Sequence, residues 1–141
     1  MDAKLLAVFL RVKKICDYLR HRASGNLLGR PLPLERRANV PAGFGLVVRF
    51  TLRDAEAAEG FDELVSRTLE GIRRQEHGTV VYVNHSVPGE PNVRLFYELY
   101  EDRAAFDAHE QQPHVRRFLE EREKFVSRTD VTFLEHIDGK V

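Results

Sequence analysis

Polar side chains that could bind or deprotonate a small molecule interrupt two apolar segments in the middle of the chain. Tyr82 and Asn84 lie in the first segment, and Glu98 lies between Phe96 and Tyr100 in the second. A phenol, an amide and a carboxyl group set among apolar residues are typical of a ligand pocket with a few fixed polar groups. A dimer interface has a similar composition, so both interpretations stay open.

A regular succession of strands and helices must position these residues. Apolar side chains alternate along the strand segments, recur at helical spacing between them, and are preceded by the N-cap residues Asp54 and Asp102. We expect strands at 44–52, 79–86, 93–100 and 131–136, a helix at 55–77 that closes at Gly78, and a second helix in two pieces around Pro113. This order predicts an α+β fold of the ferredoxin-like βαββαβ type: a four-stranded antiparallel sheet with both helices on one face.

Strand alternation then assigns side chains to the two faces of the sheet. On the third strand, the helix-covered face is expected to carry Val93, Leu95, Tyr97 and Leu99. The far face is expected to carry the candidate site residues, which are Arg49, Tyr82, Asn84, Phe96, Glu98 and Tyr100. Because strands one and three are neighbours in this topology, Arg49 and Glu98 are expected to pair across the sheet. Exposed apolar residues on that face, including Val80, also predict a homodimer.

The charge of the chain is zero but unevenly distributed. Residues 1–43 carry nine Lys and Arg against three Asp and Glu, whereas residues 44–141 carry thirteen against nineteen. We divide the chain into a basic amphipathic helix with a Pro-containing linker, residues 1–43, and a domain formed by residues 44–141. The basic helix is expected to dock on the acidic domain or on an anionic surface, and the domain is expected to fold without it. Nothing indicates nucleic-acid binding.

A lone cysteine and the absence of long apolar runs set the cellular context. Cys16 excludes an internal disulfide, which fits a reducing compartment. No segment approaches the ~18 apolar residues of a membrane span. We therefore expect a cytoplasmic protein without integral membrane association.

An ordered set of residues across the domain resembles the antibiotic biosynthesis monooxygenase (ABM) family. The set runs through a glycine turn, a tyrosine strand, a glutamate-aromatic strand and a histidine-bearing helix, and covers roughly residues 44–137. Its members are Glu76-His77-Gly78, Tyr82, the strand from Phe96 to Tyr100, Asp102, Ala105-Phe106, His109, His114 and Phe118. The resemblance implies a dimeric α+β barrel and oxygenation of a quinol, anthrone or polyketide-like aromatic without flavin, haem or metal.

On this resemblance, Tyr82, Asn84 and His109 are the candidate catalytic residues. Arg49, Phe96, Glu98 and Tyr100 are the candidate substrate-binding residues, with Arg49 able to stabilise an anionic oxygen. A structural role stays open for each: His109 could be a buried helix-packing residue, and Tyr82 a core residue. His114, beside a helix start, is expected to be a surface or capping residue. The chain has no tryptophan, unlike several anthrone oxidases of the family, and Arg49 replaces the asparagine of its haem-degrading branch.

The sequence contains no complete motif for binding a dinucleotide cofactor or a catalytic zinc ion. Gly43-Phe44-Gly45 opens a strand and lacks the third glycine of a dinucleotide site. His109 and His114 are five residues apart with Pro113 between them, which does not match the zincin spacing. We therefore expect neither a cofactor nor a metal. Two other functions stay open: a cyclase or isomerase on the same fold, and a small-ligand-binding dimer without turnover.

Overall fold

The computed structural model describes residues 43–137. The basic helix and linker expected in residues 1–43 therefore lie almost wholly outside the described residues. The elements, in chain order, are β1 (Phe44–Leu52), α2 (Ala55–Gln75), β2 (Thr79–Val87), β3 (Glu90–Tyr100), α3 (Arg103–Gln111), α4 (Pro113–Glu121), the short 3-10 helix η1 (Arg122–Lys124) and β4 (Val126–Glu135).

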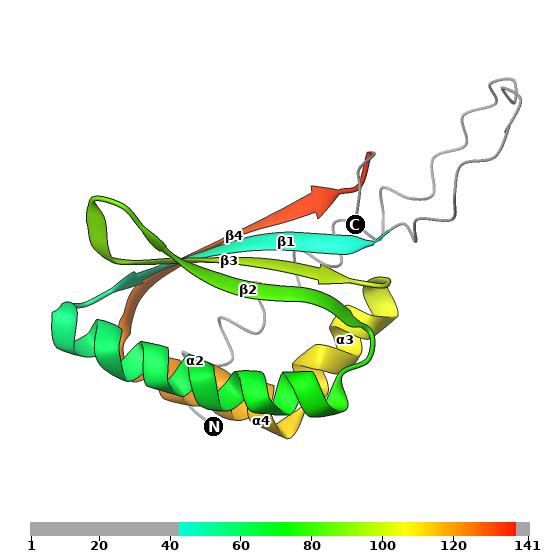
Figure 1. Cartoon of the computed structure of the whole chain (residues 1–141), viewed down its shortest axis with the longest axis horizontal. Helices are drawn as coiled ribbons and strands as arrows, with labels where there is room; N and C mark the ends of the chain where they lie inside the picture. Colours follow the sequence, from blue (N-terminus) through cyan, green and yellow to red (C-terminus); the bar gives the residue numbers. More distant parts are fainter. Residues whose placement is uncertain (1–42, 138–141) are drawn as a thin grey trace, which may run out of the picture. The chain divides into compact units, whose positions relative to one another are not determined.

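The four strands form one antiparallel sheet in the order β2-β3-β1-β4. The helices lie along one face of this sheet and leave the other face uncovered by any helix of the described part (Figure 1). This arrangement confirms the predicted ferredoxin-like fold. The second helix is divided into α3 and α4, as expected from Pro113 at the first position of α4.

Local signals in the sequence set where the helices begin. Asp54 accepts a hydrogen bond from the backbone N–H of Ala57 at 2.8 Å, and Asp102 accepts one from Ala105 at 2.8 Å. Both predicted N-caps are thus confirmed. Gly78 does not cap α2 in a left-handed conformation, because Gly89 in the β2–β3 turn has the one positive φ among the described glycines, 81°. A Cβ on Gly78 would instead lie 2.8 Å from Cβ of Ala105, so glycine allows α3 to approach β2.

An aromatic cluster between the sheet and the helices forms the core. Phe50 of β1 packs at 5.1 Å between ring centroids on both Phe61 of α2 and Phe96 of β3. Phe118 of α4 packs 5.8 Å from Phe61. All four rings are buried. Their burial holds the helices against the sheet and stabilises the fold around the site.

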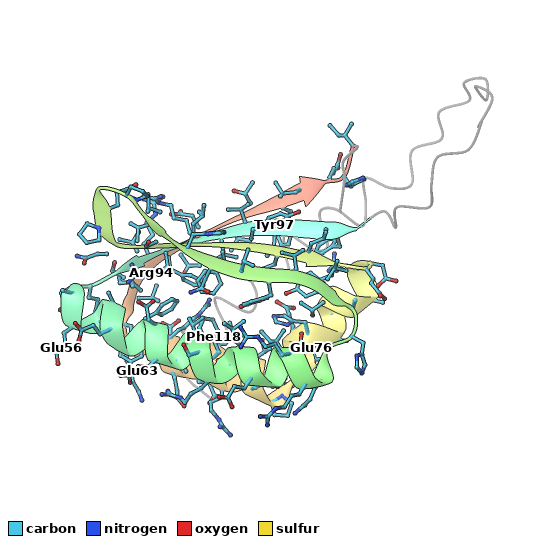
Figure 2. The ribbon with its side chains drawn as sticks, in the orientation of Figure 1. Glu56, Glu63, Glu76, Arg94, Tyr97 and Phe118 are labelled. Atoms are coloured by element: carbon cyan, nitrogen blue, oxygen red, sulfur yellow. The ribbon has the colours of Figure 1, made fainter. Side chains whose placement is uncertain are left out.

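The structure reverses the predicted faces of β3 and, with them, those of β2. Tyr82 and Asn84 lie opposite Glu98 and Phe96 in the β2–β3 register and so are on the helix-covered side, not on the far face. Phe96, Glu98 and Tyr100 are buried beneath the helices rather than on the far face. Arg94 lies between the sheet and α2, whereas Tyr97 points away from the helices (Figure 2). The prediction failed because β3 is apolar on both sides, so alternation alone does not reveal which side the helices cover.

This reversal also separates the expected Arg49–Glu98 pair. Arg49 lies opposite Leu95 in the β1–β3 register, on the open face, and pairs with Glu90 instead. The predicted reason for dimerisation changes too, because Phe96 and Tyr100 are fully buried within the subunit. The open face nevertheless carries a row of neighbours, Val83, Tyr97 and Val47, across three strands.

No helix of the described residues is both long and apolar enough to span a membrane.

Candidate active site

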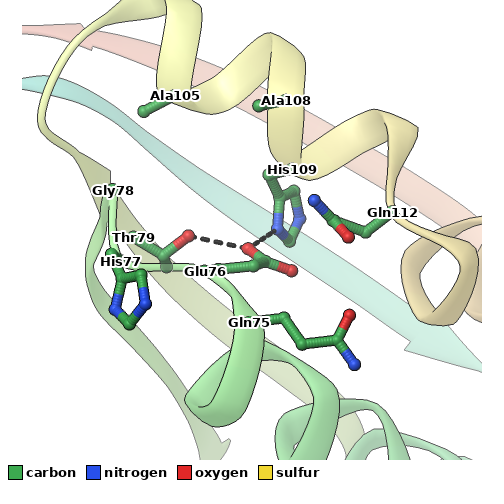
Figure 3. Close-up of a pocket in the computed structure, with 9 residues that line it drawn as sticks. All are labelled: Gln75, Glu76, His77, Gly78, Thr79, Ala105, Ala108, His109 and Gln112. Atoms are coloured by element: carbon green, nitrogen blue, oxygen red, sulfur yellow. Dashed lines mark hydrogen bonds and ion pairs between the residues drawn. The ribbon is translucent and has the colours of Figure 1, made fainter.

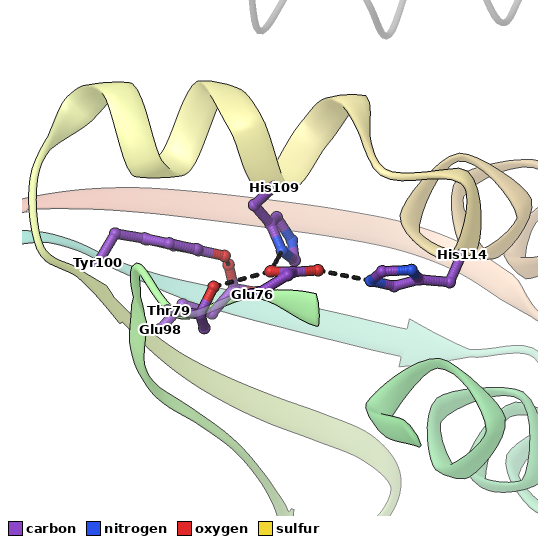
Figure 4. A network of polar contacts seen from close by, with 6 residues as sticks. All are labelled: Glu76, Thr79, Glu98, Tyr100, His109 and His114. Atoms are coloured by element: carbon purple, nitrogen blue, oxygen red, sulfur yellow. Dashed lines mark hydrogen bonds and ion pairs between the residues drawn. The ribbon is translucent and has the colours of Figure 1, made fainter. Parts of the chain in front are cut away.

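A buried carboxylate joins three elements at one end of the sheet. Glu76 follows the last residue of α2, and its side chain is 4% exposed. Oε2 accepts a hydrogen bond from the hydroxyl of Thr79 at 2.7 Å and lies 2.6 Å from Nδ1 of His109. Oε1 lies 2.5 Å from Nε2 of His114. Glu76 thus links the start of β2 to α3 and to the start of α4 (Figure 4).

The surroundings of Glu76 favour its charged form. Burial by itself raises the pKa of the carboxyl group, but the hydrogen bond and positive potential of His109, with further hydrogen bonds from Thr79 and His114, outweigh burial. The pKa of Glu76 is therefore lowered from its ordinary value. At neutral pH the site contains an ionised carboxylate held by three donors.

His109 connects this carboxylate to the aromatic interior. It projects from α3, its side chain is 7% exposed, and Nδ1 faces Glu76. The imidazole packs 5.5 Å from the ring of Tyr82 and 5.1 Å from the ring of Tyr100, measured between centroids. His109 is thus the one candidate catalytic residue that touches both the polar cluster and two candidate aromatic residues.

A second buried carboxyl group lies next to these rings. The hydroxyl of Tyr100 donates a hydrogen bond to Oε2 of Glu98 at 2.8 Å. Burial raises the pKa of Glu98 above its ordinary value, although the hydrogen bond from Tyr100 opposes this shift. Burial, with the nearby charge of Glu98, also raises the pKa of Tyr82 and Tyr100. Both phenols therefore stay protonated at neutral pH, and Glu98 is disposed to take up a proton.

Arg122 adds a buried positive group that the sequence did not single out. Its Nε has no hydrogen-bond partner among the described residues, and the guanidinium lies 5.5 Å from the ring centre of Phe50. The pKa of Arg122 is lowered from its ordinary value by burial, although the negative charges of Glu123 and Glu98 oppose this shift. The one available signal was helical spacing, because Arg122 follows the buried Phe118 by four residues.

Two small pockets reach this cluster from outside. A pocket of about 120 Å³ is lined by Glu76 and His109 together with Gln75, His77, Gly78, Thr79, Ala105, Ala108 and Gln112 (Figure 3). A second, of about 260 Å³, lies between α2 and α4 and is lined by His114 and the side chains of Arg67, Arg74 and Arg117, among others. Of these two pockets, the first is the one lined by both Glu76 and His109.

The structure brings together five of the seven residues proposed from the sequence. Tyr82, His109, Phe96, Glu98 and Tyr100 all lie on the helix-covered side, and Tyr82 packs on both Phe96 and His109.

Asn84 and Arg49 are not part of this group. Asn84 lies opposite Phe96 in the β2–β3 register but is exposed, and Arg49 is on the other face of the sheet. Their proposed roles in catalysis and binding stay predictions.

The residues that sequence reasoning missed are the partners of His109. Glu76 and His114 belong to the set that resembles the ABM family, but neither was given a role in the site. His114 was expected to be a surface or capping residue, and it is instead half-buried with its Nε2 on Glu76. Gly71 was a usable signal, because a glycine within a long helix often marks the close approach of another group. Here that group is the His114 ring.

The comparison with known protein families agrees with this fold. Residues 43–121 match the family model described as antibiotic biosynthesis monooxygenase. The match spans more than half of the chain, so the protein belongs to the ABM family. No protein of curated function matches the chain in sequence.

Several solved structures share the fold. The Rv0793 protein of Mycobacterium tuberculosis has a TM-score of 0.64 and 22% identity, over 70% of this chain and 99% of that one. A Caulobacter crescentus protein, named as a candidate antibiotic biosynthesis monooxygenase, has a TM-score of 0.65 and 16% identity, over 70% of this chain and 92% of that one. A Pseudomonas aeruginosa protein has a TM-score of 0.62 and 20% identity, over 69% and 96% of the two chains. At these identities the likeness establishes the fold alone.

Proposed function

We propose that the protein is a monooxygenase that oxidises a quinol, an anthrone or a polyketide-like aromatic with molecular oxygen. One observation carries the proposal: the imidazole of His109 is bound at Nδ1 by a buried carboxylate and is packed against the rings of Tyr82 and Tyr100. This arrangement supplies a proton acceptor beside apolar aromatic surface. Membership of the ABM family supports it.

The chemistry needs few groups from the protein. An electron-rich phenol becomes a reductant of oxygen once it loses its O–H proton, and His109 is the group placed to take that proton. For an anthrone, addition of O₂ at the CH₂ carbon followed by loss of one water leaves a new carbonyl, so that one oxygen atom enters the product. Burial of the site limits the access of water to the reactive anion. We propose that no flavin, haem or metal takes part.

The size of the pocket bears on the choice of substrate. Pockets that enclose small ligands commonly measure ~300–1,000 Å³, and the pocket at Glu76 and His109 measures about 120 Å³. A single hydroxylated ring is therefore the best match to the pocket as it stands. A three-ring anthrone would require α3 to move away from β2, or would bind with part of its surface outside.

We also propose that the working form is a homodimer. The open face of the sheet carries Val83, Tyr97 and Val47 side by side, and Leu134 of β4 is 39% exposed. Packing of two such faces would form the barrel implied by the family resemblance and would remove this apolar surface from water.

A non-oxidative activity is the second candidate, and the Glu98 carboxyl group favours it. A buried carboxyl with a raised pKa can donate a proton while His109 accepts one, and such an acid–base pair serves isomerisation or cyclisation without oxygen. Oxygen dependence separates the two candidates. A dimer that binds an aromatic ligand without converting it is the third.

An oxygen-uptake assay tests the proposal. The purified protein, treated with a chelator, is mixed with a panel of single-ring quinols and anthrones in a closed oxygen-electrode cell. We expect uptake above the uncatalysed rate with at least one substrate, and its loss in His109→Gln. His136→Gln is the matched control, because His136 is exposed beyond the end of β4. Product formation at the same rate without oxygen would favour the isomerase, and binding without conversion would favour the ligand-binding dimer.

A further inference from the structure

The contacts of Glu76 distinguish the two nitrogens of His109. An ionised carboxylate only accepts hydrogen bonds, so Nδ1 of His109, 2.6 Å from Oε2, must carry a proton. In the neutral imidazole, Nε2 then holds the lone pair. No hydrogen bond to Nε2 is formed within residues 43–137, which leaves this nitrogen able to accept a proton from a bound molecule.

The carboxylate itself is fixed from several sides. The hydroxyl of Thr79 donates to the oxygen that faces His109, and His114 binds the other oxygen. The backbone of Glu76 is held at both ends, since its N–H donates to the carbonyl of Ile72 at 3.0 Å and its carbonyl accepts from Thr79 at 3.2 Å. Glu76 is therefore a preorganised partner rather than a mobile surface acid.

We propose that Glu76 is the positioning residue of His109, and that Nε2 of His109 is the atom that takes the substrate proton; this inference rests on the proposed function. In this step the O–H bond of the substrate breaks and an N–H bond forms at Nε2. The electron pair of the broken bond stays on the substrate oxygen. The imidazolium that results is stabilised by the carboxylate on its opposite nitrogen, while Glu76 itself stays ionised.

The other charged and titratable groups around the pair do not replace Glu76 in this role. Tyr82, Glu98 and Tyr100 approach the imidazole from the sheet, and Glu110 follows His109 on α3. None of these four groups is hydrogen-bonded to His109 in the described structure. His114 acts one step further away: by binding Oε1 it holds the carboxylate in the orientation that presents Oε2 to His109.

A double-mutant cycle tests this inference in the full-length protein. His109→Gln and Glu76→Gln are each expected to lower kcat by about 10²–10⁴-fold, the usual contribution of general acid–base catalysis. If Glu76 acts through His109, Glu76→Gln has no further effect beyond about twofold in the His109→Gln background. Thr79→Val is the control, because it removes one hydrogen bond to the Glu76 carboxylate but leaves this group facing His109. It is expected to lower kcat by less than about tenfold.

Nitrogen-15 NMR of labelled histidines gives a readout that needs no substrate. At pH 8 the wild-type protein is expected to hold His109 in the Nδ1–H form, with His109→Gln used to assign its signals. Glu76→Gln, whose amide can also donate, is expected to shift His109 toward the Nε2–H form. His114→Gln keeps a neutral donor for Oε1 and is expected to leave the His109 signals unchanged.

The two readouts separate failure of this inference from failure of the proposed function. An Nε2–H form of His109 in the wild-type protein, or equal losses from Glu76→Gln with and without His109, would overturn the positioning role. If no substrate on the panel is turned over, the proposed oxygenase is wrong. The histidine spectra alone then decide whether Glu76 orients His109.

Discussion

Replacement of Gly71 by alanine is expected to destabilise the protein when residue 114 is histidine. The same replacement is expected to stabilise the protein when residue 114 is alanine. Gly71 lies within α2 and faces the ring of His114 across the α2–α4 contact. A Cβ at position 71 would lie 2.5 Å from Cγ, 2.7 Å from Nδ1 and 2.8 Å from Cδ2 of that ring. These distances are well below the ~3.5–4.0 Å of favourable carbon contacts, so the ring must move. Its movement breaks the hydrogen bond between Nε2 and Glu76.

The net effect follows from two opposing terms. Alanine is better than glycine in a helix interior by about 1 kcal/mol. A hydrogen bond to a charged group contributes about 1.5–3 kcal/mol, and its loss in Gly71→Ala outweighs the helical gain. We expect the free energy of unfolding to fall by about 1 kcal/mol, which lowers Tm by roughly 4–8 °C in a domain of this size.

The same substitution in a His114→Ala background is expected to stabilise the protein by up to about 1 kcal/mol, because the ring is gone and only the helical gain remains. Thermal and urea unfolding followed by circular dichroism measure all four proteins. A stabilising effect of Gly71→Ala in the wild-type background would refute the packing of His114 on Gly71. So would equal destabilisation in both backgrounds.

Because burial raises the pKa of Glu98, ionisation of this group destabilises the folded state as pH rises above its ordinary pKa. The Tm of Glu98→Gln should therefore equal that of the wild-type protein at pH 4 and exceed it at pH 8. A wild-type advantage that grows with pH would contradict this. Arg94→Met removes a bidentate ion pair with Asp62, at 2.8 Å for each bond, and a hydrogen bond to the carbonyl of Pro91 at 2.9 Å. Urea unfolding should show that the free energy of unfolding falls by about 1–3 kcal/mol, and Arg94→Lys should recover less than half of this loss. Light scattering should give about twice the 16.3 kDa chain mass for the wild-type protein and a monomer for Tyr97→Lys, and a monomeric wild-type protein would remove the proposed open-face dimer.

The elements could be predicted where local signals are strong. Asp54 and Asp102 cap the starts of α2 and α3, and Pro113 marks the start of α4. Alternation along residues 44–52 predicts β1 with the bounds that the structure shows. β4 begins at Val126, five residues before the predicted start. β4 lies at the edge of the sheet, and its first half, Val126–Asp130, contains mostly polar residues. Alternation of apolar and polar residues is therefore weak there.

The candidate site was only partly accessible from the sequence because it depends on how helices meet. His109 could be selected from its helix and its place in the family-like set of residues. Its link to Glu76 and His114 requires the end of α2 to meet α3 and α4, and periodicity within one element carries no information on such a contact. The expected Arg49–Glu98 pair failed for a related reason. Arg49 lies on the open face as expected, but Glu98 does not, since a two-sided apolar strand leaves the facing of β3 undetermined.

Labelled oxygen shows whether the chain transfers oxygen to an electron-rich aromatic, as proposed. The chelator-treated protein is supplied with ¹⁸O₂ and with the quinol or anthrone that gives the fastest uptake, and the product is analysed by mass spectrometry. We predict one ¹⁸O atom in each product molecule, at a rate that falls by about 10²-fold or more in His109→Gln. A product that forms without ¹⁸O, or at the same rate in His109→Gln, would contradict the proposed oxygenase.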